Sequence, residues 1–233
     1  MELIPPIQTF HFKKTHRLIS SRFPPVGILD AVSSPEDLGA IFELESWTND
    51  RISKELGIIE NIPRLEWVLG KPNATIIMAA FCHPQPEGSR FNDGSIGAWY
   101  AALSLNTAHA EVIHHRQLEL AEVGVSTASL TMREYIAEFQ ADFHSLLGGR
   151  EEFERYYNPI SYAASQELGT VLRERGSNGI VYRSVRDPKG TCVVCFRPSQ
   201  ILNVRQGAHF EYHFSSHGPT RIHRIRTEVS GSR

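Results

Sequence analysis

The sequence predicts a single mixed α+β domain. The chain has 233 residues, of which 41% are hydrophobic and 21% are charged, so it is long enough to bury one good core. Short apolar runs typical of strands and capped segments typical of helices occur along the same chain. Since no internal repeat or Gly/Pro-rich linker divides them, we assign residues 1–233 to one domain.

The predicted N-terminal elements are short. Residues 1–15 form an extended lead-in, and the stretch around Arg17 forms a short strand that the following Pro-Pro pair ends. A helix begins at Ser33–Asp37, where a hydroxyl cap, a proline in the first turn and two acids suit a helix start. A second short helix covers about residues 48–56, behind another capping sequence.

The middle of the chain is predicted to alternate strands with one long helix. Residues 58–73 are expected to be loop, and residues 74–81 a buried strand because the run is apolar. Residues 97–104 form a second strand. Hydroxyl and amide side chains at its end cap a helix over about 104–120, and residues 128–139 form the next strand.

The C-terminal third is predicted to be mostly β. A helix over 162–175 ends near a glycine, and a hairpin of strands 179–182 and 192–196 follows. Two further segments are expected to pair with each other, residues 200–204 and 210–214. We expect the arginine-rich tail, residues 217–233, to be flexible.

Composition argues against several classes of protein. The formal charge of −2 and the pI of about 6.6 give no basic excess for nucleic-acid binding, which only the basic tail would support. No run of about 18 apolar residues predicts a membrane span, and the N-terminus lacks the pattern of a signal peptide. We therefore expect a cytoplasmic protein with no membrane partner.

The cysteines and histidines predict neither a disulfide framework nor a metal site. Cys192 and Cys195 form a Cys-x-x-Cys sequence, but they lie in an apolar, β-branched run that predicts a strand, where positions i and i+3 face opposite sides. His114 and His115 are adjacent, so they cannot both face one metal from a helix, and no His-Glu-x-x-His sequence occurs. We expect no catalytic metal.

The stretch Phe81–Glu111 carries the strongest functional signal. A turn bracketed by glycines presents Arg90 and Asn92, a short strand carries Tyr100, and a helix then points Glu111 along one face. A guanidinium suits phosphate groups, and a carboxylate suits sugar hydroxyls or a developing positive charge. These residues predict a site for an anionic, sugar-containing ligand.

Each of these residues also has a purely structural interpretation. Glu111 could be a solvated helix carboxylate, although its Ala-Glu-Val-Ile setting is apolar, and Tyr100 could be a core residue. Ser184 suits a turn, and no Gly-x-Ser-x-Gly sequence supports it as a nucleophile. Arg17 and Arg22 are further candidates for binding phosphate. Because no dinucleotide-binding or phosphate-binding glycine loop occurs, side chains would have to hold such a ligand.

Five pieces of sequence in one order resemble the RES-domain family, the toxins of a bacterial toxin–antitoxin class. The pieces are His16–Ile19, Gly88–Asn92, Ala98–Ser104, Thr107–Glu111 and Gly179–Ser184. A longer subset of the family also carries pieces similar to two others, Ser21–Pro25 and Glu45–Asn49. The resemblance covers a core of about residues 16–205, interrupted by a helical insert at about 30–75 that is larger than in compact members.

The resemblance implies a fold similar to the NAD-binding core of ADP-ribosyltransferases, and destruction of NAD⁺ by hydrolysis or phosphorolysis of its nicotinamide–ribose bond. Arg17 and Arg90 would hold the pyrophosphate and ribose side, helped by Arg22 and Asn92, and Tyr100 would line the nicotinamide site. Glu111 would stabilise the oxocarbenium-like transition state. Ser184 would bind substrate, with Ser165 as a second candidate because family members place a pocket serine in the preceding helix.

NAD⁺ would thus be the substrate, inorganic phosphate a second substrate in the phosphorolytic case, and no cofactor would be permanently bound. The partner implied is an Xre/ParS-type antitoxin. An ADP-ribosyltransferase acting on a macromolecule and a catalytically silent partner-binding module remain alternatives.

Overall fold

The computed structural model describes residues 3–22, 27–32, 34–38, 59–149, 151–216 and 218–225. Over these ranges the secondary-structure elements are β1 Ile7–Ser20, η1 Ile28–Asp30, η2 Arg64–Glu66, α3 Ala74–Cys82, β2 Trp99–Ala102, α4 Leu105–Glu122, β3 Thr127–Ser145, η3 Glu151–Tyr157, α5 Ala163–Glu174, β4 Gly179–Arg183, β5 Thr191–Cys195, η4 Pro198–Gln200, β6 Leu202–Ser215 and β7 Arg221–Ile225, where η marks 3-10 helices. The predicted mixed α+β class is confirmed.

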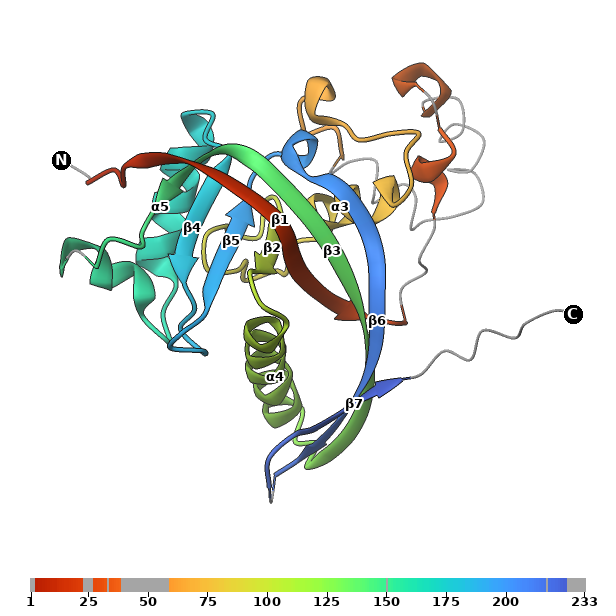
Figure 1. The fold of residues 1–233 in the computed structure, drawn as a ribbon, viewed down its shortest axis with the longest axis vertical. Helices are drawn as coiled ribbons and strands as arrows, with labels where there is room; N and C mark the ends of the chain where they lie inside the picture. The colour runs from red at the N-terminus through yellow and green to blue at the C-terminus, as the bar shows by residue number, and fades with distance from the viewer. Residues whose placement is uncertain are drawn as a thin grey trace, which may run out of the picture.

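The described strands form one sheet in the order β1-β2-β5-β4-β3-β6-β7, and β1 also pairs with β3. Because of this extra pairing, β1, β2, β5, β4 and β3 form a closed ring of strand partners. All ring pairings are antiparallel except that of β3 with β4. Figure 1 shows β3 and β6 running side by side as long, curved strands, with β7 at their lower end.

Two hydrophobic clusters cover the two faces of the strands β2, β4 and β5. One contains Trp99, Val181 and Cys195 and packs against α3, and the other contains Tyr182 and Cys192 and packs against α4 and α5. Successive strand residues alternate between the clusters, as the pleat requires. The prediction that the two cysteines face opposite sides is confirmed, and both thiols are free and buried.

The prediction of a buried strand at residues 74–81 is wrong, because the segment forms helix α3. Six of its nine residues are buried, and its apolar side chains surround the helix axis, so no polar face reveals the helical period. The expected lead-in and short strand at the N-terminus form one strand, β1. The described start of the insert agrees with a helix, since the Asp37 N–H donates to Ser34 Oγ at 3.1 Å; the helix expected at 48–56 lies outside the described residues.

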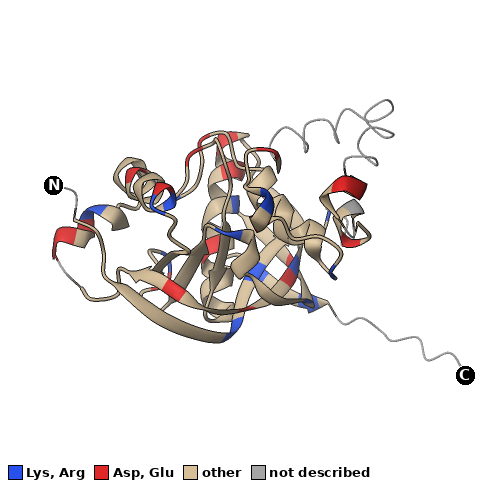
Figure 2. Cartoon of the chain, turned by 90° about the horizontal axis from the view of Figure 1, so that it is seen from above, with Lys and Arg blue, Asp and Glu red and all other residues tan. Residues whose placement is uncertain are grey.

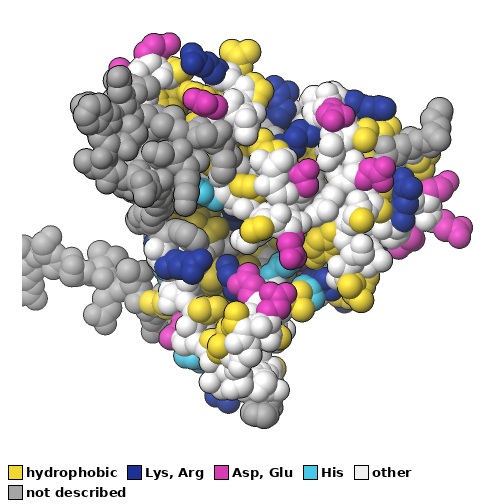
Figure 3. Space-filling model, turned by 180° about the vertical axis from the view of Figure 1, so that it is seen from behind, with side chains coloured by type: hydrophobic (Ala, Val, Ile, Leu, Met, Phe, Trp, Pro, Cys, Tyr) yellow, Lys and Arg dark blue, Asp and Glu magenta, His cyan; other side chains and the backbone are white. Residues whose placement is uncertain are grey.

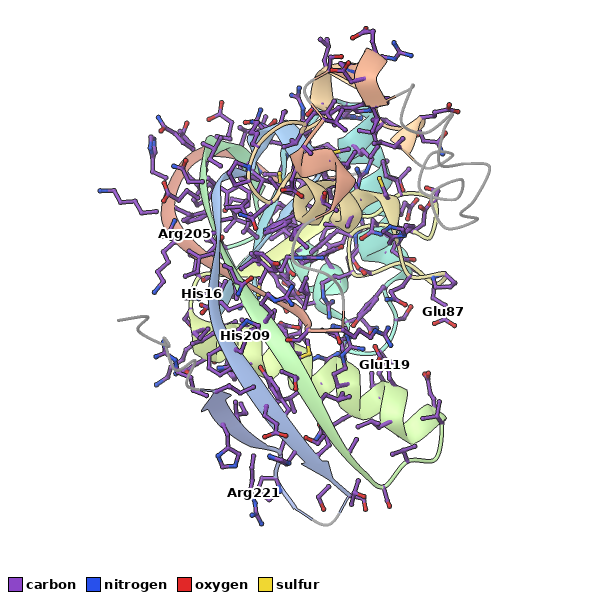
Figure 4. All side chains as sticks on the ribbon, turned by 90° about the vertical axis from the view of Figure 1, so that its right-hand side faces the viewer. His16, Glu87, Glu119, Arg205, His209 and Arg221 are labelled. Atoms are coloured by element: carbon purple, nitrogen blue, oxygen red, sulfur yellow. The ribbon has the colours of Figure 1, made fainter. Side chains whose placement is uncertain are left out.

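The expected β pair between residues 200 and 214 is also wrong, because both segments belong to the single strand β6, which pairs with β3. Within β6, Gly207 lies at an irregularity where a Cβ would come within 2.3 Å of Glu134 Oε2. That carboxylate is buried: it accepts the Ala208 N–H at 2.9 Å and lies 2.6 Å from His16 Nδ1. Figure 4 labels His16 beside β3 and β6.

The tail expected to be flexible contains an ordered strand. Arg221–Ile225 form β7, which pairs with His209–His213 of β6. The remainder of the predicted tail, from residue 226, lies outside the described residues. Basic and acidic residues are interspersed along the drawn chain (Figure 2), in keeping with the small net charge. Of the described helices, none has both the length and the apolar character of a membrane span.

An ion pair between the buried Glu66 and the partly exposed Arg197 fastens the segment before α3 to the core. Glu66 Oε1 accepts the Arg197 Nε–H at 2.7 Å as well as a bond from Arg197 Nη2, and Glu66 Oε2 accepts the Ser199 hydroxyl. Burial raises the pKa of Glu66, but these hydrogen bonds outweigh it, so the pKa lies below its ordinary value. A carboxyl whose pKa is lower in the folded than in the unfolded state stabilises the folded protein at pH values above the unfolded pKa. This stabilisation is lost as pH falls through the folded pKa.

We therefore expect Glu66→Gln to lower the free energy of unfolding at pH 7 by about 1–3 kcal/mol. Urea unfolding across pH 3–7 measures this, and the gap between wild type and variant should begin to narrow below about pH 4.3, the ordinary pKa of an unfolded Glu, and close as pH falls through the lower folded pKa. A gap that is constant with pH would contradict the ion-pair explanation.

Candidate active site

The centre of the site is a hydrogen bond between Ser184, just after β4, and Glu111 on α4. Ser184 is buried, and its hydroxyl donates to Glu111 Oε1 at 2.6 Å. Its Oγ also accepts the backbone N–H groups of Arg186 at 3.0 Å and Asp187 at 2.9 Å. Because both lone pairs of Oγ are engaged, the hydroxyl proton points to the carboxylate, and the turn fixes the orientation of Glu111.

The start of α4 is tied to the same turn. Ser104 caps the helix by accepting the Thr107 N–H at 3.1 Å, as the capping sequence predicted. The Thr107 hydroxyl donates to Asp187 Oδ2 at 2.7 Å. Gly190 closes the turn against this pair, since a Cβ there would lie 2.4 Å from Thr107 Cγ2. Two tethers, one at Thr107 and one at Glu111, therefore set the position of the helix against β4.

The groups beside Glu111 are kept uncharged. Burial, and secondly Glu111, raises the pKa of Cys192, whose Sγ lies 3.9 Å from Glu111 Oε1, so the thiol stays protonated. His114 follows Glu111 by one helical turn. Burial, and secondly Arg186, lowers its pKa, and its Nε2 is buried without a hydrogen-bond partner among the described residues. Two neighbours of Glu111, Cys192 and His114, are therefore neutral.

Arg90 points into the molecule. Its guanidinium is buried, and Nη1 donates to the carbonyl oxygens of Tyr156 at 3.1 Å and Asn158 at 3.0 Å. The guanidinium carbon lies 4.5 Å from the ring centroid of Tyr162. The glycine expected to allow a tight turn does so: Gly88 has φ +76°, and a Cβ there would lie 2.2 Å from the Asn92 carbonyl oxygen.

Tyr100 and Asn92 support the loop that carries Arg90. The Tyr100 hydroxyl donates to Asn92 Oδ1 at 2.8 Å and accepts the Phe91 N–H at 2.9 Å. The Asn92 amide donates to the carbonyl oxygens of Asp93 and Ile96. Burial raises the pKa of Tyr100, so the hydroxyl keeps its proton. Because the Tyr100 hydroxyl bonds to the loop, only the Tyr100 ring is free to line the nicotinamide site, and that role stays a prediction.

The other predicted residues lie apart from Glu111. Arg17 Nη1 donates to the Tyr100 carbonyl oxygen at 3.1 Å, but its guanidinium stacks 4.9 Å from Trp99, in the opposite core cluster from Tyr100. Burial lowers the pKa of Arg17 to about 10. Arg22 is exposed beyond the end of β1. Ser165 is buried in α5 and donates to the Tyr162 carbonyl oxygen at 3.0 Å, so of the two serines only Ser184 contacts Glu111.

Arg186 is a site residue that the sequence reasoning missed. In the sequence it is one of two arginines near Ser184, and nothing there showed that its side chain and that of Arg90 donate to the same segment, residues 156–159. Figure 3 shows acidic, basic and histidine side chains gathered near the middle of the face turned away from the viewer in Figure 1. Within the described part of the chain, no three His, Cys, Asp or Glu side chains converge as metal ligands would.

An open hollow elsewhere shares none of these residues. It lies at the β6–β7 turn and is lined by His213, Phe214, Ser215, Gly218, Pro219, Arg221 and His223. The hydrogen-bonded group around Glu111 therefore remains the candidate site.

Comparison with known proteins decides the family. The sequence profile of the RES domain matches residues 62–215, which include Arg90, Tyr100, Glu111 and Ser184. The chain belongs to the RES-domain family. A relative, protein y4oC of Sinorhizobium fredii, is 29% identical over 203 residues, which cover 84% of this chain and 81% of y4oC. Among solved structures, the M. tuberculosis MbcT–MbcA toxin–antitoxin complex is similar with a TM-score of 0.44 and 13% identity, over 91% of this chain and 86% of that one.

In this RES-domain protein, Ser184→Ala is expected to lower kcat by about 10-fold with little change in KM, because Glu111 loses the donor that orients it. The lost turn hydrogen bonds should also lower the free energy of unfolding by about 1 kcal/mol. Steady-state turnover of the substrate measures the first effect. Ser165→Ala is the matched control, since its hydroxyl bonds to Tyr162, and equal losses in both variants would contradict the assignment.

Proposed function

We propose that the protein degrades NAD⁺ by cleaving the bond between nicotinamide and ribose. The observation that carries this proposal is that Ser184 orients the Glu111 carboxylate. Glu111 belongs to a loop–strand–helix unit that also presents Arg90. Membership of the RES-domain family supports it, because the resemblance implies NAD⁺ destruction. The charges suit the substrate, which carries two phosphates and a cationic leaving group.

In the reaction, the C1′–N bond breaks and its electron pair leaves with neutral nicotinamide. Positive charge then develops on the ribose, and Glu111 stabilises it at fixed geometry. An oxygen of water or phosphate then bonds to C1′. Water gives ADP-ribose and a released proton, whereas phosphate gives a phosphorylated ADP-ribose. Arg90 would bind the phosphates, and neutral Cys192 and Tyr182 would form an apolar wall beside the carboxylate.

As a toxin acting on cellular NAD⁺, the protein would work in the cytoplasm and would require an antitoxin of the Xre/ParS type to hold it inactive. The inhibitor would act by blocking access to Glu111 and Arg90. These statements rest on the family resemblance, and co-expression of a neighbouring helix-turn-helix protein, followed by an assay for relief of NAD⁺ loss, tests them.

The direct test is to incubate the purified protein with NAD⁺, with and without inorganic phosphate, and to quantify nicotinamide by chromatography. We expect nicotinamide release, and the identity of the second product distinguishes the two acceptors. Absence of nicotinamide under both conditions would overturn the proposal. ADP-ribose attached to added protein or nucleic acid would instead identify a transferase.

A further inference from the structure

A second arginine reaches the site from the turn that orients Glu111. The Arg186 backbone N–H donates to Ser184 Oγ, which fixes where its side chain starts. Arg186 Nη2 donates to the Pro159 carbonyl oxygen at 2.6 Å. The positive charge of Arg186 acts on α4, because after burial it is the second cause of the lowered pKa of His114. Arg186 is thus fixed at its base by the same serine that orients Glu111.

Arg186 and Arg90 hold the same segment of chain. Arg90 donates to two carbonyl oxygens, of Tyr156 and Asn158, and Arg186 donates to a third, of Pro159. Two guanidinium groups therefore converge on the carbonyl oxygens of residues 156–159. The segment then turns sharply, because Asn158 Oδ1 accepts the N–H groups of Ile160 and Ser161, both at 2.9 Å.

Within the described part of the chain, no ion pair compensates the charge of either guanidinium. Among the described residues, their hydrogen bonds go to neutral backbone carbonyls, and neither forms an ion pair. Arg183 and Arg197, by contrast, pair with Glu154 and Glu66. Because charged acceptors form hydrogen bonds roughly twice as strong as neutral ones, an anion can replace the carbonyls as partner of both guanidiniums.

We propose that Arg186 is a further substrate-binding residue, which together with Arg90 binds the pyrophosphate of the dinucleotide. The inference rests on the proposed function for the identity of the ligand. On binding, phosphate oxygens replace the carbonyl oxygens of residues 156–159, and that segment is released. Ile160, the next residue, is 91% exposed, so little packing holds the chain in place after the segment is released.

The test uses inorganic pyrophosphate and ADP-ribose as probes, titrated by calorimetry in phosphate-free buffer into wild type, Arg186→Gln and Arg183→Gln. Arg186→Gln is expected to weaken both affinities by about 10-fold or more, since a charge-assisted contact with the anion is lost. Arg183→Gln is the matched control: it removes the same charge three residues away and also contacts the 151–157 helix, but its charge is already paired with Glu154. Its affinities should stay within about 2-fold of wild type.

Hydrogen exchange adds a second readout that a purely structural role would not change. Pyrophosphate should speed exchange at residues 156–162 in wild type, whereas Arg186→Gln should exchange fast there with or without it. Equal pyrophosphate affinity for wild type and Arg186→Gln, or no binding to wild type, would overturn the inference.

The inference and the proposed function fail separately. If the wild-type protein binds both probes through Arg186 but releases no nicotinamide, the anion-site inference stands and the proposed NAD⁺ activity is wrong. If wild type and Arg186→Gln release nicotinamide with the same KM, the proposed activity stands and the assignment of Arg186 is wrong.

Discussion

Glu111→Gln is expected to lower kcat for nicotinamide release by about 10²–10³-fold. The amide keeps the size of the side chain but removes the negative charge that faces the developing cation on the ribose. Its oxygen can still accept the Ser184 hydroxyl, so the turn after β4 and the start of α4 should keep their structure. NAD⁺ binding, measured by calorimetry, should stay within about 3-fold, because the carboxylate acts on the transition state more than on the ground state.

Glu119→Gln is the matched control for this variant. It lies two turns further along α4, where its carboxylate is largely exposed and pairs with Arg116. Its turnover should equal that of wild type. Full activity in Glu111→Gln would remove the carboxylate from the mechanism even if the protein proves to consume NAD⁺.

Gly169→Ala is expected to give the largest loss of stability, lowering the free energy of unfolding by about 2–4 kcal/mol. In an open helix this change would be favourable by about 1 kcal/mol. Here a Cβ would lie 2.0 Å from the Phe91 carbonyl oxygen, so α5 or the loop carrying Arg90 must move. Urea unfolding measures the loss, and turnover at a temperature where the variant is folded should also fall, because Arg90 is displaced.

Gly148→Ala provides the comparison, since a Cβ at that position meets no atom within 4 Å. Its free energy of unfolding should lie within about 0.5 kcal/mol of wild type. An unchanged midpoint for Gly169→Ala would show that α5 can move away from the Arg90 loop without cost.

Local signals in the sequence were sufficient for much of the fold. Ser104 and the sequence after it predicted the start of α4, and the β-branched run around Cys192 predicted a strand with alternating faces. The errors came from long-range packing. Helix α3 lacks a polar face because the core surrounds it, and β6 contains Gly207 because the buried Glu134 lies against that position. Neither contact can be read from neighbouring residues.

The candidate site shows the same division. Arg90, Tyr100 and Glu111 could be proposed because they lie in one loop–strand–helix unit of 22 residues. The contact of Ser184 with Glu111 joins positions 73 residues apart, so the sequence could name the serine but not choose it over Ser165. Arg186 was missed because its role depends on carbonyl oxygens of residues 156–159, which carry no signal in side-chain chemistry.

The closed ring of strands also governs when the candidate site can form during synthesis of the chain. β1 is made first, but its pairing with β3 must wait for more than 100 further residues. The ring closes only when β5, which joins β2 to β4, has left the ribosome. Glu111 is made early, but Ser184 and the turn that orients it come just before β5. A nascent chain therefore has no oriented carboxylate until the segment through about Cys195 has left the ribosome, so the contact of Ser184 with Glu111 forms only when the domain is nearly complete.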